Sequence, residues 1–65
     1  MRVEIYVGKQ LKPYLVTTAN ALNVHVGEWV TVSKNNKRKM KGGIIDKIIH
    51  LIDEDEVYTI RIFLK

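Results

Sequence analysis

The 65-residue chain contains 46% hydrophobic residues, no cysteine and a formal net charge of +4. Its length predicts one small domain over residues 1–65, and its hydrophobic content argues against disorder. The lack of cysteine excludes disulfide bonds and thiolate metal sites. No apolar run approaches the roughly 18 residues of a membrane span, and the N-terminal segment lacks the apolar core of a signal peptide. We therefore expect a cytoplasmic protein without a membrane partner, whose positive charge favours anionic partners.

Two strands are expected in the first third of the chain. Apolar and polar residues alternate over residues 2–7, which is the period of a half-buried strand. Residues 12–17 indicate a short strand near a sheet edge, because Pro13 cannot donate a hydrogen bond to a ladder. Apolar residues alternate again over residues 22–26 and lead into the next strand.

Residues 28–33 are rich in β-branched and aromatic side chains and predict a strand. The segment Ile44–Ile52 is ambiguous. Its six aliphatic side chains cluster on a helical wheel, which is typical of an amphipathic helix. Its five isoleucines and the preceding glycine pair favour a strand, and a bulge near Asp46-Lys47 would bury most of those isoleucines.

Apolar and polar residues alternate most clearly over residues 57–64, which predicts the last strand. It follows an acidic turn at Asp53–Glu56. Five short strands with polar turns indicate a mainly β fold, a small five-stranded barrel without free edges. If Ile44–Ile52 is a helix instead, the fold is α+β.

The segment from Lys34 to Lys41 holds five of the eleven basic residues and no acid, and it is predicted to be a loop between two strands. Such a loop can neutralise several phosphates, and Asn35 can hydrogen-bond to a phosphate or a base edge. The alternative is a solvated loop that keeps a small barrel soluble. The candidate nucleic-acid-binding residues are Lys34, Asn35, Lys37, Arg38, Lys39, Lys41, Trp29 and Tyr14.

The aromatic candidates depend on which way their side chains point. If Val30 and Val32 face the core, Trp29 faces outward, where it can stack on a base or contact a protein. The alternative is that Trp29 closes one end of the core. Tyr14, beside Pro13, can likewise hold a ligand or simply cover the barrel.

No pattern in the chain indicates catalysis or metal binding. His25 and His50 have no ligand spacing, Ser33 has no adjacent base, and the glycine pair is too short for a phosphate-binding loop. We expect a protein that is not an enzyme and carries no metal or cofactor. The acidic turn and the basic segment can pair between two copies, giving a homodimer or a filament, or within one molecule, or stay apart.

Two segments of the sequence resemble SH3-like small barrels. Residues 26–32, VGEWVTV, are similar to their Gly-acidic-x-Val-x-Val strand entry, and residues 43–48 followed by 58–62 are similar to their later hairpin. The resemblance implies a small barrel, a fold that often binds peptides or partner proteins through aromatic grooves.

A second resemblance is carried by residues 3–7, 11–16, 22–32 and 43–45, in this order. In these segments the sequence resembles the N-terminal DNA-binding domain of the primosomal replication-restart helicase, which captures the 3′ end of a DNA strand. Tyr14 and Gly27 carry over by position, whereas Pro13, Trp29 and residues 33–35 depart from the family pattern. The resemblance implies a stand-alone DNA-binding module of similar fold.

Two functions of different classes follow from these patterns. The first is a small nucleic-acid-binding module, with single-stranded or duplex DNA favoured over RNA. The second is a protein-interaction adaptor that binds an acidic protein, of the kind found among phage or mobile-element accessory proteins.

Overall fold

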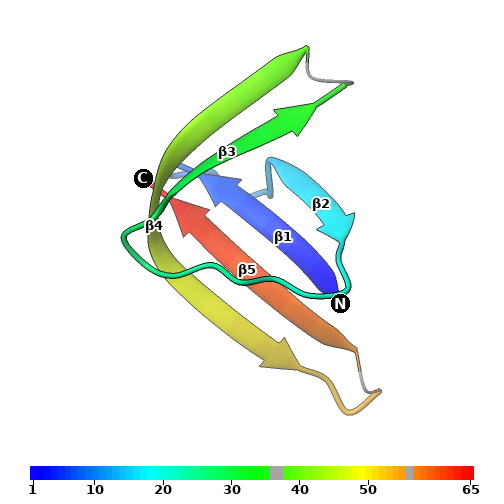
Figure 1. The fold of residues 1–65 in the computed structure, drawn as a ribbon. Coiled ribbons are helices and arrows are strands. Elements are labelled where there is room, and N and C mark those ends of the chain that lie inside the picture. The colour runs from blue at the N-terminus through cyan, green and yellow to red at the C-terminus, as the bar shows by residue number, and fades with distance from the viewer. Residues whose placement is uncertain (36–37, 56) are drawn as a thin grey trace.

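The computed structural model describes residues 1–35, 38–55 and 57–65, which form five β-strands (Figure 1). The described residues contain no helix, and consequently none long and apolar enough to cross a membrane. The fold is therefore mainly β, as predicted, and the alternative of a helix over Ile44–Ile52 is wrong. The strands are β1 (Arg2–Val7), β2 (Leu15–Thr18), β3 (Trp29–Lys34), β4 (Lys39–Ile52) and β5 (Tyr58–Leu64).

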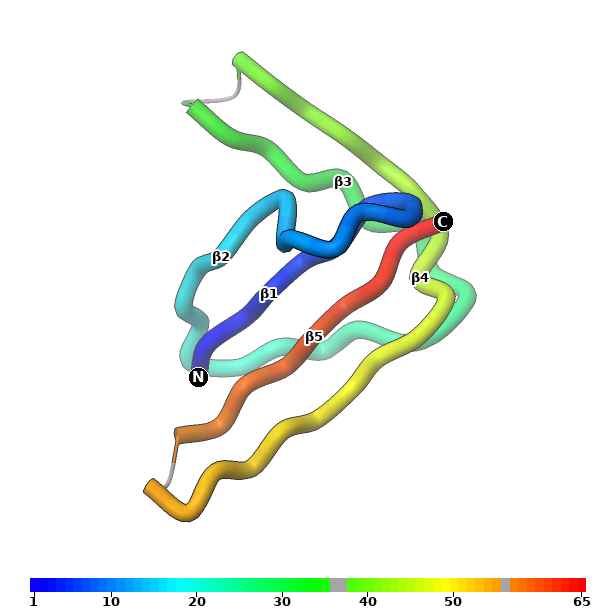
Figure 2. Tube along the Cα trace, turned by 180° about the vertical axis from the view of Figure 1, so that it is seen from behind, coloured from blue at the N-terminus to red at the C-terminus, as the bar shows by residue number. Residues whose placement is uncertain are grey.

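The strands form one sheet in the order β2-β1-β5-β4-β3, which curls into a nearly closed barrel (Figure 2). Only β1 and β5 are parallel; the other neighbours are antiparallel. The long strand β4 serves both halves, because its first part pairs with β3 and its second part with β5. A register shift between Ile45 and Lys47 places a bulge where the sequence indicates one, and a bulge bends a strand in this way.

The core lies inside the curled sheet and draws on four strands. Residues 19–28 form an extended connection rather than a strand, although Leu22 and Val24 still pack against the core, as their alternation suggests. Each fully buried isoleucine or leucine stabilises the fold by about 1.5–3 kcal/mol relative to exposure. The buried apolar residues are Val3, Ile5, Val32, Ile45, Ile60, Ile62 and Leu64.

The second strand starts later than the predicted range of residues 12–17. It covers Leu15–Thr18, and Tyr14 before it makes a backbone hydrogen bond to the carbonyl of Ile5 at 2.7 Å. Pro13 has no N–H to contribute, so regular pairing begins only beyond it.

The predicted basic loop is largely a β-hairpin, which corrects the interpretation of residues 34–41. Lys34 ends β3, and β4 already begins at Lys39. Asn35 has a positive φ of 52°, and its carbonyl accepts a hydrogen bond from the Arg38 N–H, which closes a tight turn. The alternation of residues 39–43 is hidden in the sequence by lysines and glycines, which have low strand propensity.

The expectation that a bulged strand buries most of the isoleucines is wrong. Ile45 is buried, whereas Ile48 and Ile49 are half-buried. Ile44, which pairs with Trp29 on the outer face of the hairpin, is 46% exposed, and Ile52, the last residue of β4, is 79% exposed.

Candidate nucleic-acid interface

Tyr14 lies beside two lysines of the β3–β4 hairpin. The Nζ atoms of Lys34 and Lys41 are 4.1 and 5.0 Å from the centre of its ring, within cation–π distance. Lys34 pairs with Lys39 in the sheet, and Lys41 pairs with the buried Val32. Directly paired residues share a face of a sheet, so all three lysines lie on the inner face of the hairpin. Two predicted cations and a predicted aromatic ring thus meet at one place.

This cluster spans the gap between the two free edges of the sheet. Strands β2 and β3 end the strand order, and Tyr14 immediately precedes β2. Each cation–π contact stabilises by about 0.5–1 kcal/mol at an exposed site. Side chains rather than backbone hydrogen bonds therefore connect these two edges.

The charges of the hairpin are uncompensated within the described part of the chain. None of Lys34, Arg38, Lys39 and Lys41 forms a salt bridge with a described carboxylate. The ammonium groups of Lys34 and Lys41 both lie near the Tyr14 ring and repel each other, and an anion bound to both would relieve that repulsion. The inner face of the hairpin is consequently suited to a phosphate group.

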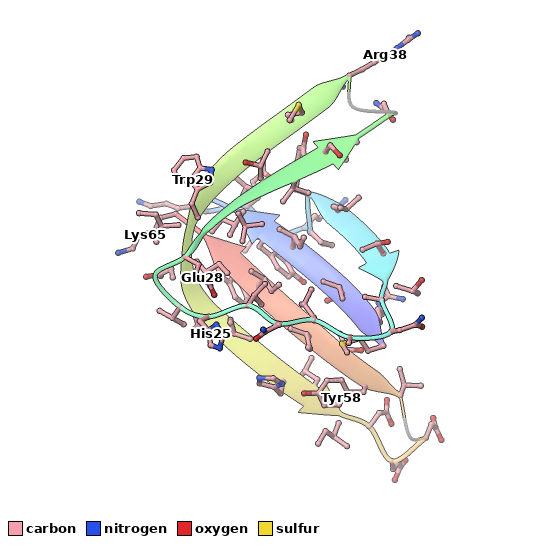
Figure 3. All side chains as sticks on the ribbon, viewed as in Figure 1. His25, Glu28, Trp29, Arg38, Tyr58 and Lys65 are labelled. Carbon is pink, nitrogen blue, oxygen red and sulfur yellow. The ribbon has the colours of Figure 1, made fainter. Side chains whose placement is uncertain are left out.

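The tip of the hairpin holds two further predicted site residues. Asn35 and Arg38 flank the turn, and the Arg38 side chain extends outward just before the start of β4 (Figure 3). Lys37 lies outside the described residues.

Trp29 is exposed, so of the two orientations that the sequence left open the structure has the outward one, and Trp29 does not close the core. Its side chain lies over Gly42, where an added Cβ would come within 2.7 Å of the indole Cζ2. The indole Nε1 donates a hydrogen bond to Thr31 Oγ1 at 3.1 Å, while 66% of the residue remains exposed. The indole is therefore held in place on one side and open to stacking on the other.

The structure separates Trp29 from Tyr14. Trp29 pairs with Ile44, and both side chains lie on the outer face of the hairpin. Met40 and Ile44 on the same face are 60% and 46% exposed, so an apolar patch of Trp29, Met40 and Ile44 covers that face. The sequence interpretation missed Met40 and Ile44, because their strand alternation with Trp29 is visible only once residues 39–44 are paired with β3.

A second polar cluster lies on the outer face of the main sheet. The buried Glu4 accepts hydrogen bonds from Arg61 Nε and Arg2 Nε, both at 2.8 Å, and from the Tyr6 hydroxyl at 3.2 Å. The hydrogen bond from Arg61 and then that from Arg2 lower the pKa of Glu4 below its usual value, and Glu4 raises the pKa of Arg61. The Tyr6 ring stacks on Phe63 with centroids 4.8 Å apart, so Tyr6 covers the sheet rather than joining Tyr14.

The two histidines lie in separate places. His25 Nδ1 is 2.8 Å from Glu28 Oε1, and His50 Nδ1 contacts the Tyr58 hydroxyl. Over residues 1–35, 38–55 and 57–65, no three histidine, aspartate or glutamate side chains gather as ligands of a metal ion would.

The fold and this site define a small, nearly closed five-stranded barrel with a projecting basic hairpin. Comparison with the models of protein families, with curated proteins and with solved structures found no match.

Proposed function

We propose that this chain is a small stand-alone nucleic-acid-binding module that contacts phosphates through the basic hairpin, residues 34–41, and has no enzymatic activity. The observation that carries the proposal is the convergence of Lys34 and Lys41 on Tyr14. Two ammonium groups held about one ring, without a described acidic partner, provide a fixed site for a phosphate.

In this proposal Tyr14 positions the lysines, because its ring is already engaged by their ammonium groups. Trp29 stacks on a base, since its outer ring face is open. Nucleic acid that contacts both must cross the free edge of β3. A flexible single strand can do so more easily than a stiff duplex, so we favour single-stranded DNA. The preference for DNA over RNA is what the resemblance of the sequence to the DNA-binding domain of the primosomal helicase implies.

The test is fluorescence anisotropy of a labelled single-stranded oligonucleotide with the double variant Lys34→Gln/Lys41→Gln. Loss of two phosphate contacts should weaken binding by roughly 10–30-fold in ~0.1 M salt. The matched control is Lys9→Gln/Lys47→Gln, whose lysines lie by a different hollow near Phe63. Both variants lower the net charge from +4 to +2 (4 − 2 = 2). If both weaken oligonucleotide binding equally, overall charge explains the effect, and the proposed phosphate site is wrong.

The role of Tyr14 is tested separately. Tyr14→Phe keeps the ring and should bind as the wild type does, whereas Tyr14→Leu removes the cation–π contacts and should weaken binding several-fold. Equal affinity of both variants would show that the ring does not position the lysines.

The patch of Trp29, Met40 and Ile44 favours a second candidate function, that of a protein-interaction adaptor. Exposed aromatic and methionine side chains are typical of protein contact surfaces. Capture of an acidic protein that resists added salt, is lost in Trp29→Ser and survives in Lys34→Gln/Lys41→Gln would support this candidate. Salt-sensitive capture that depends on the lysines would oppose it.

A further inference from the structure

The acidic and basic segments lie at opposite ends of the molecule. The β4–β5 turn and the tip of the basic hairpin are far apart (Figure 1), along a molecule whose longest dimension is 35 Å. Asp53, Glu54 and Asp55 at that turn are exposed, and none of them pairs with a described cation. The acidic turn and the basic hairpin are therefore too far apart to pair within one molecule.

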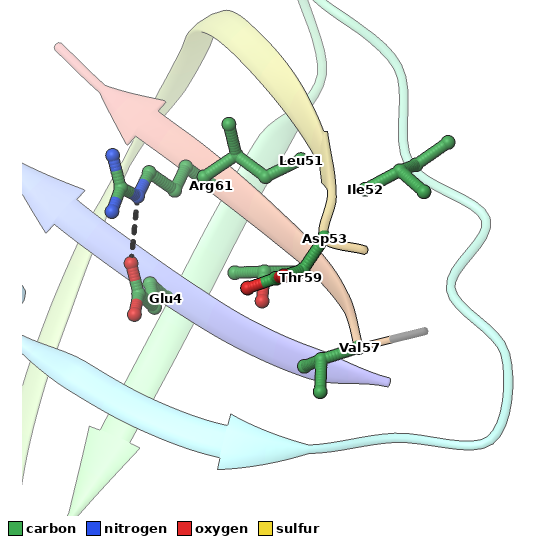
Figure 4. A pocket seen from close by; sticks show the side chains of 7 residues that line it. All are labelled: Glu4, Leu51, Ile52, Asp53, Val57, Thr59 and Arg61. Atoms are coloured by element: carbon green, nitrogen blue, oxygen red, sulfur yellow. Dashed lines mark hydrogen bonds and ion pairs between the residues drawn. The ribbon is translucent and has the colours of Figure 1, made fainter. Parts of the chain in front are cut away.

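The acidic end also contains a hollow of about 390 Å³ whose lining is partly apolar and partly polar (Figure 4). Leu51, Ile52 and Val57 line it, and the latter two are 79% and 50% exposed. This volume holds roughly a dozen water molecules, enough for a long side chain to enter. The hollow thus offers apolar walls to a partner.

The charge around the hollow selects the kind of group that fits. Glu4 and Arg61 also line it, but Glu4 is paired with both Arg61 and Arg2 at 2.8 Å, so this cluster adds no negative charge to the hollow. Asp53 remains as the uncompensated charge at the rim, and its carboxylate accepts the Asp55 N–H at 3.1 Å, which fixes the turn. A cationic head on an aliphatic stem, as in arginine or lysine, matches this combination.

The other end of the molecule presents such groups. Arg38 extends from the hairpin tip (Figure 3), and Lys39 and the 60% exposed Met40 follow it. We propose that the hollow at the β4–β5 end receives the hairpin tip of a second copy of this chain. Each copy then uses its tip toward one neighbour and its hollow toward another.

This contact is heterologous, so it continues into chains of copies unless the rotation closes a ring. Ion pairs between exposed groups are screened by salt, so association should fall as ionic strength rises. The proposal does not rest on nucleic-acid binding, but both use Arg38 and Lys39, so an oligonucleotide should compete with the second copy.

Two variants, each lacking one surface, test the proposal in sedimentation velocity at low salt. Arg38→Gln/Lys39→Gln removes two charges next to the tip, and Asp53→Asn/Asp55→Asn removes two charges of the acidic turn while keeping an acceptor for the turn. The wild type should form species that grow with concentration, and each variant alone should associate roughly 10-fold more weakly. Circular dichroism confirms that both variants fold.

The decisive sample is an equimolar mixture of the two variants. It should yield 1:1 dimers and nothing larger, because one intact tip and one intact hollow remain. A wild type that stays monomeric at millimolar concentration, or a mixture no more associated than its components, would overturn the proposal. Asp53→Asn/Asp55→Asn keeps the whole basic hairpin, so its oligonucleotide binding should not be weakened, which separates this proposal from the nucleic-acid function.

Discussion

At the scale of single residues, Glu4 differs most from its surroundings in the sheet. It is a buried carboxylate held by two arginines that are themselves half exposed, with side-chain exposures of 52% for Arg2 and 41% for Arg61. Its position in an alternating strand predicts a solvent-facing side chain, and the partner Arg61 is 57 residues away in sequence. Only the parallel pairing of β1 with β5 brings the two together.

Glu4 should make stability depend on pH in the acid range. Its pKa is lowered in the folded state from the usual 4.5, so the unfolded state binds the proton first as the pH falls. Its contribution is complete above about pH 4.5 and is lost as the pH falls through the lowered folded value. Glu4→Gln should lower stability by about 1–2 kcal/mol at pH 7, a figure reduced by solvent screening of the arginines.

Urea unfolding at pH 7 and at pH 3 checks this expectation. The difference between wild type and Glu4→Gln should narrow at the lower pH, because protonated Glu4 and glutamine then carry no charge. A difference that stays constant between the two pH values would show that packing, not the charge, stabilises this position.

Two neighbouring glycines provide a matched pair of substitutions. A Cβ at Gly43 would lie 2.5 Å from the Lys65 carbonyl oxygen, whereas a Cβ at Gly42 would meet the movable Trp29 side chain. Gly43→Ala should therefore destabilise by about 1–3 kcal/mol, and Gly42→Ala by less while changing the Trp29 fluorescence. Thermal unfolding with emission spectra measures both, and equal losses of stability in the two variants would contradict the account.

At the scale of elements, the sequence predicts strands well where apolar residues alternate. Strand β5 and the alternation of β1 were predicted, and β4 was predicted as a bulged strand from its isoleucines. The start of β4 was not, because lysine and glycine at residues 39–43 carry no apolar period. That part of the strand is stabilised by pairing with β3, which a local pattern does not show.

The same limit applies to the candidate site. Charge and composition identified the cations and both aromatic residues. The lysines lie on the inner face of the hairpin and Trp29 on its outer face. This arrangement depends on the register of β3 with β4, which the turn fixes. Tyr14 and Lys34 are brought together only by the curling of the sheet.

The hairpin turn carries a prediction of its own. Asn35 has φ of 52°, a conformation that glycine adopts freely and a β-branched residue resists. Asn35→Gly should leave stability within about 0.5 kcal/mol, and Asn35→Val should cost about 1–2 kcal/mol and fray the hairpin. Chemical denaturation gives both values, and a valine variant as stable as the glycine variant would contradict this conformation.

At the scale of the whole molecule, charge is distributed along the long axis, with basic groups at the hairpin and acidic groups at the β4–β5 turn. Because the two ends of the molecule carry charges of opposite sign, its electric field directs an approaching polyanion toward the basic hairpin. The same arrangement supports head-to-tail contacts between copies, and nucleic acid and a second copy then compete for one tip.

The most direct test of the central claim is the salt dependence of oligonucleotide affinity, measured for the wild type and for Lys34→Gln/Lys41→Gln. Each phosphate neutralised on a single strand contributes a slope of about 0.7 in log Kd against log salt. We predict that the double variant lowers the slope by about 1.4, while the control variant Lys9→Gln/Lys47→Gln lowers it much less. Equal slopes for the wild type and Lys34→Gln/Lys41→Gln, or no binding by the wild type at low salt, would contradict the account.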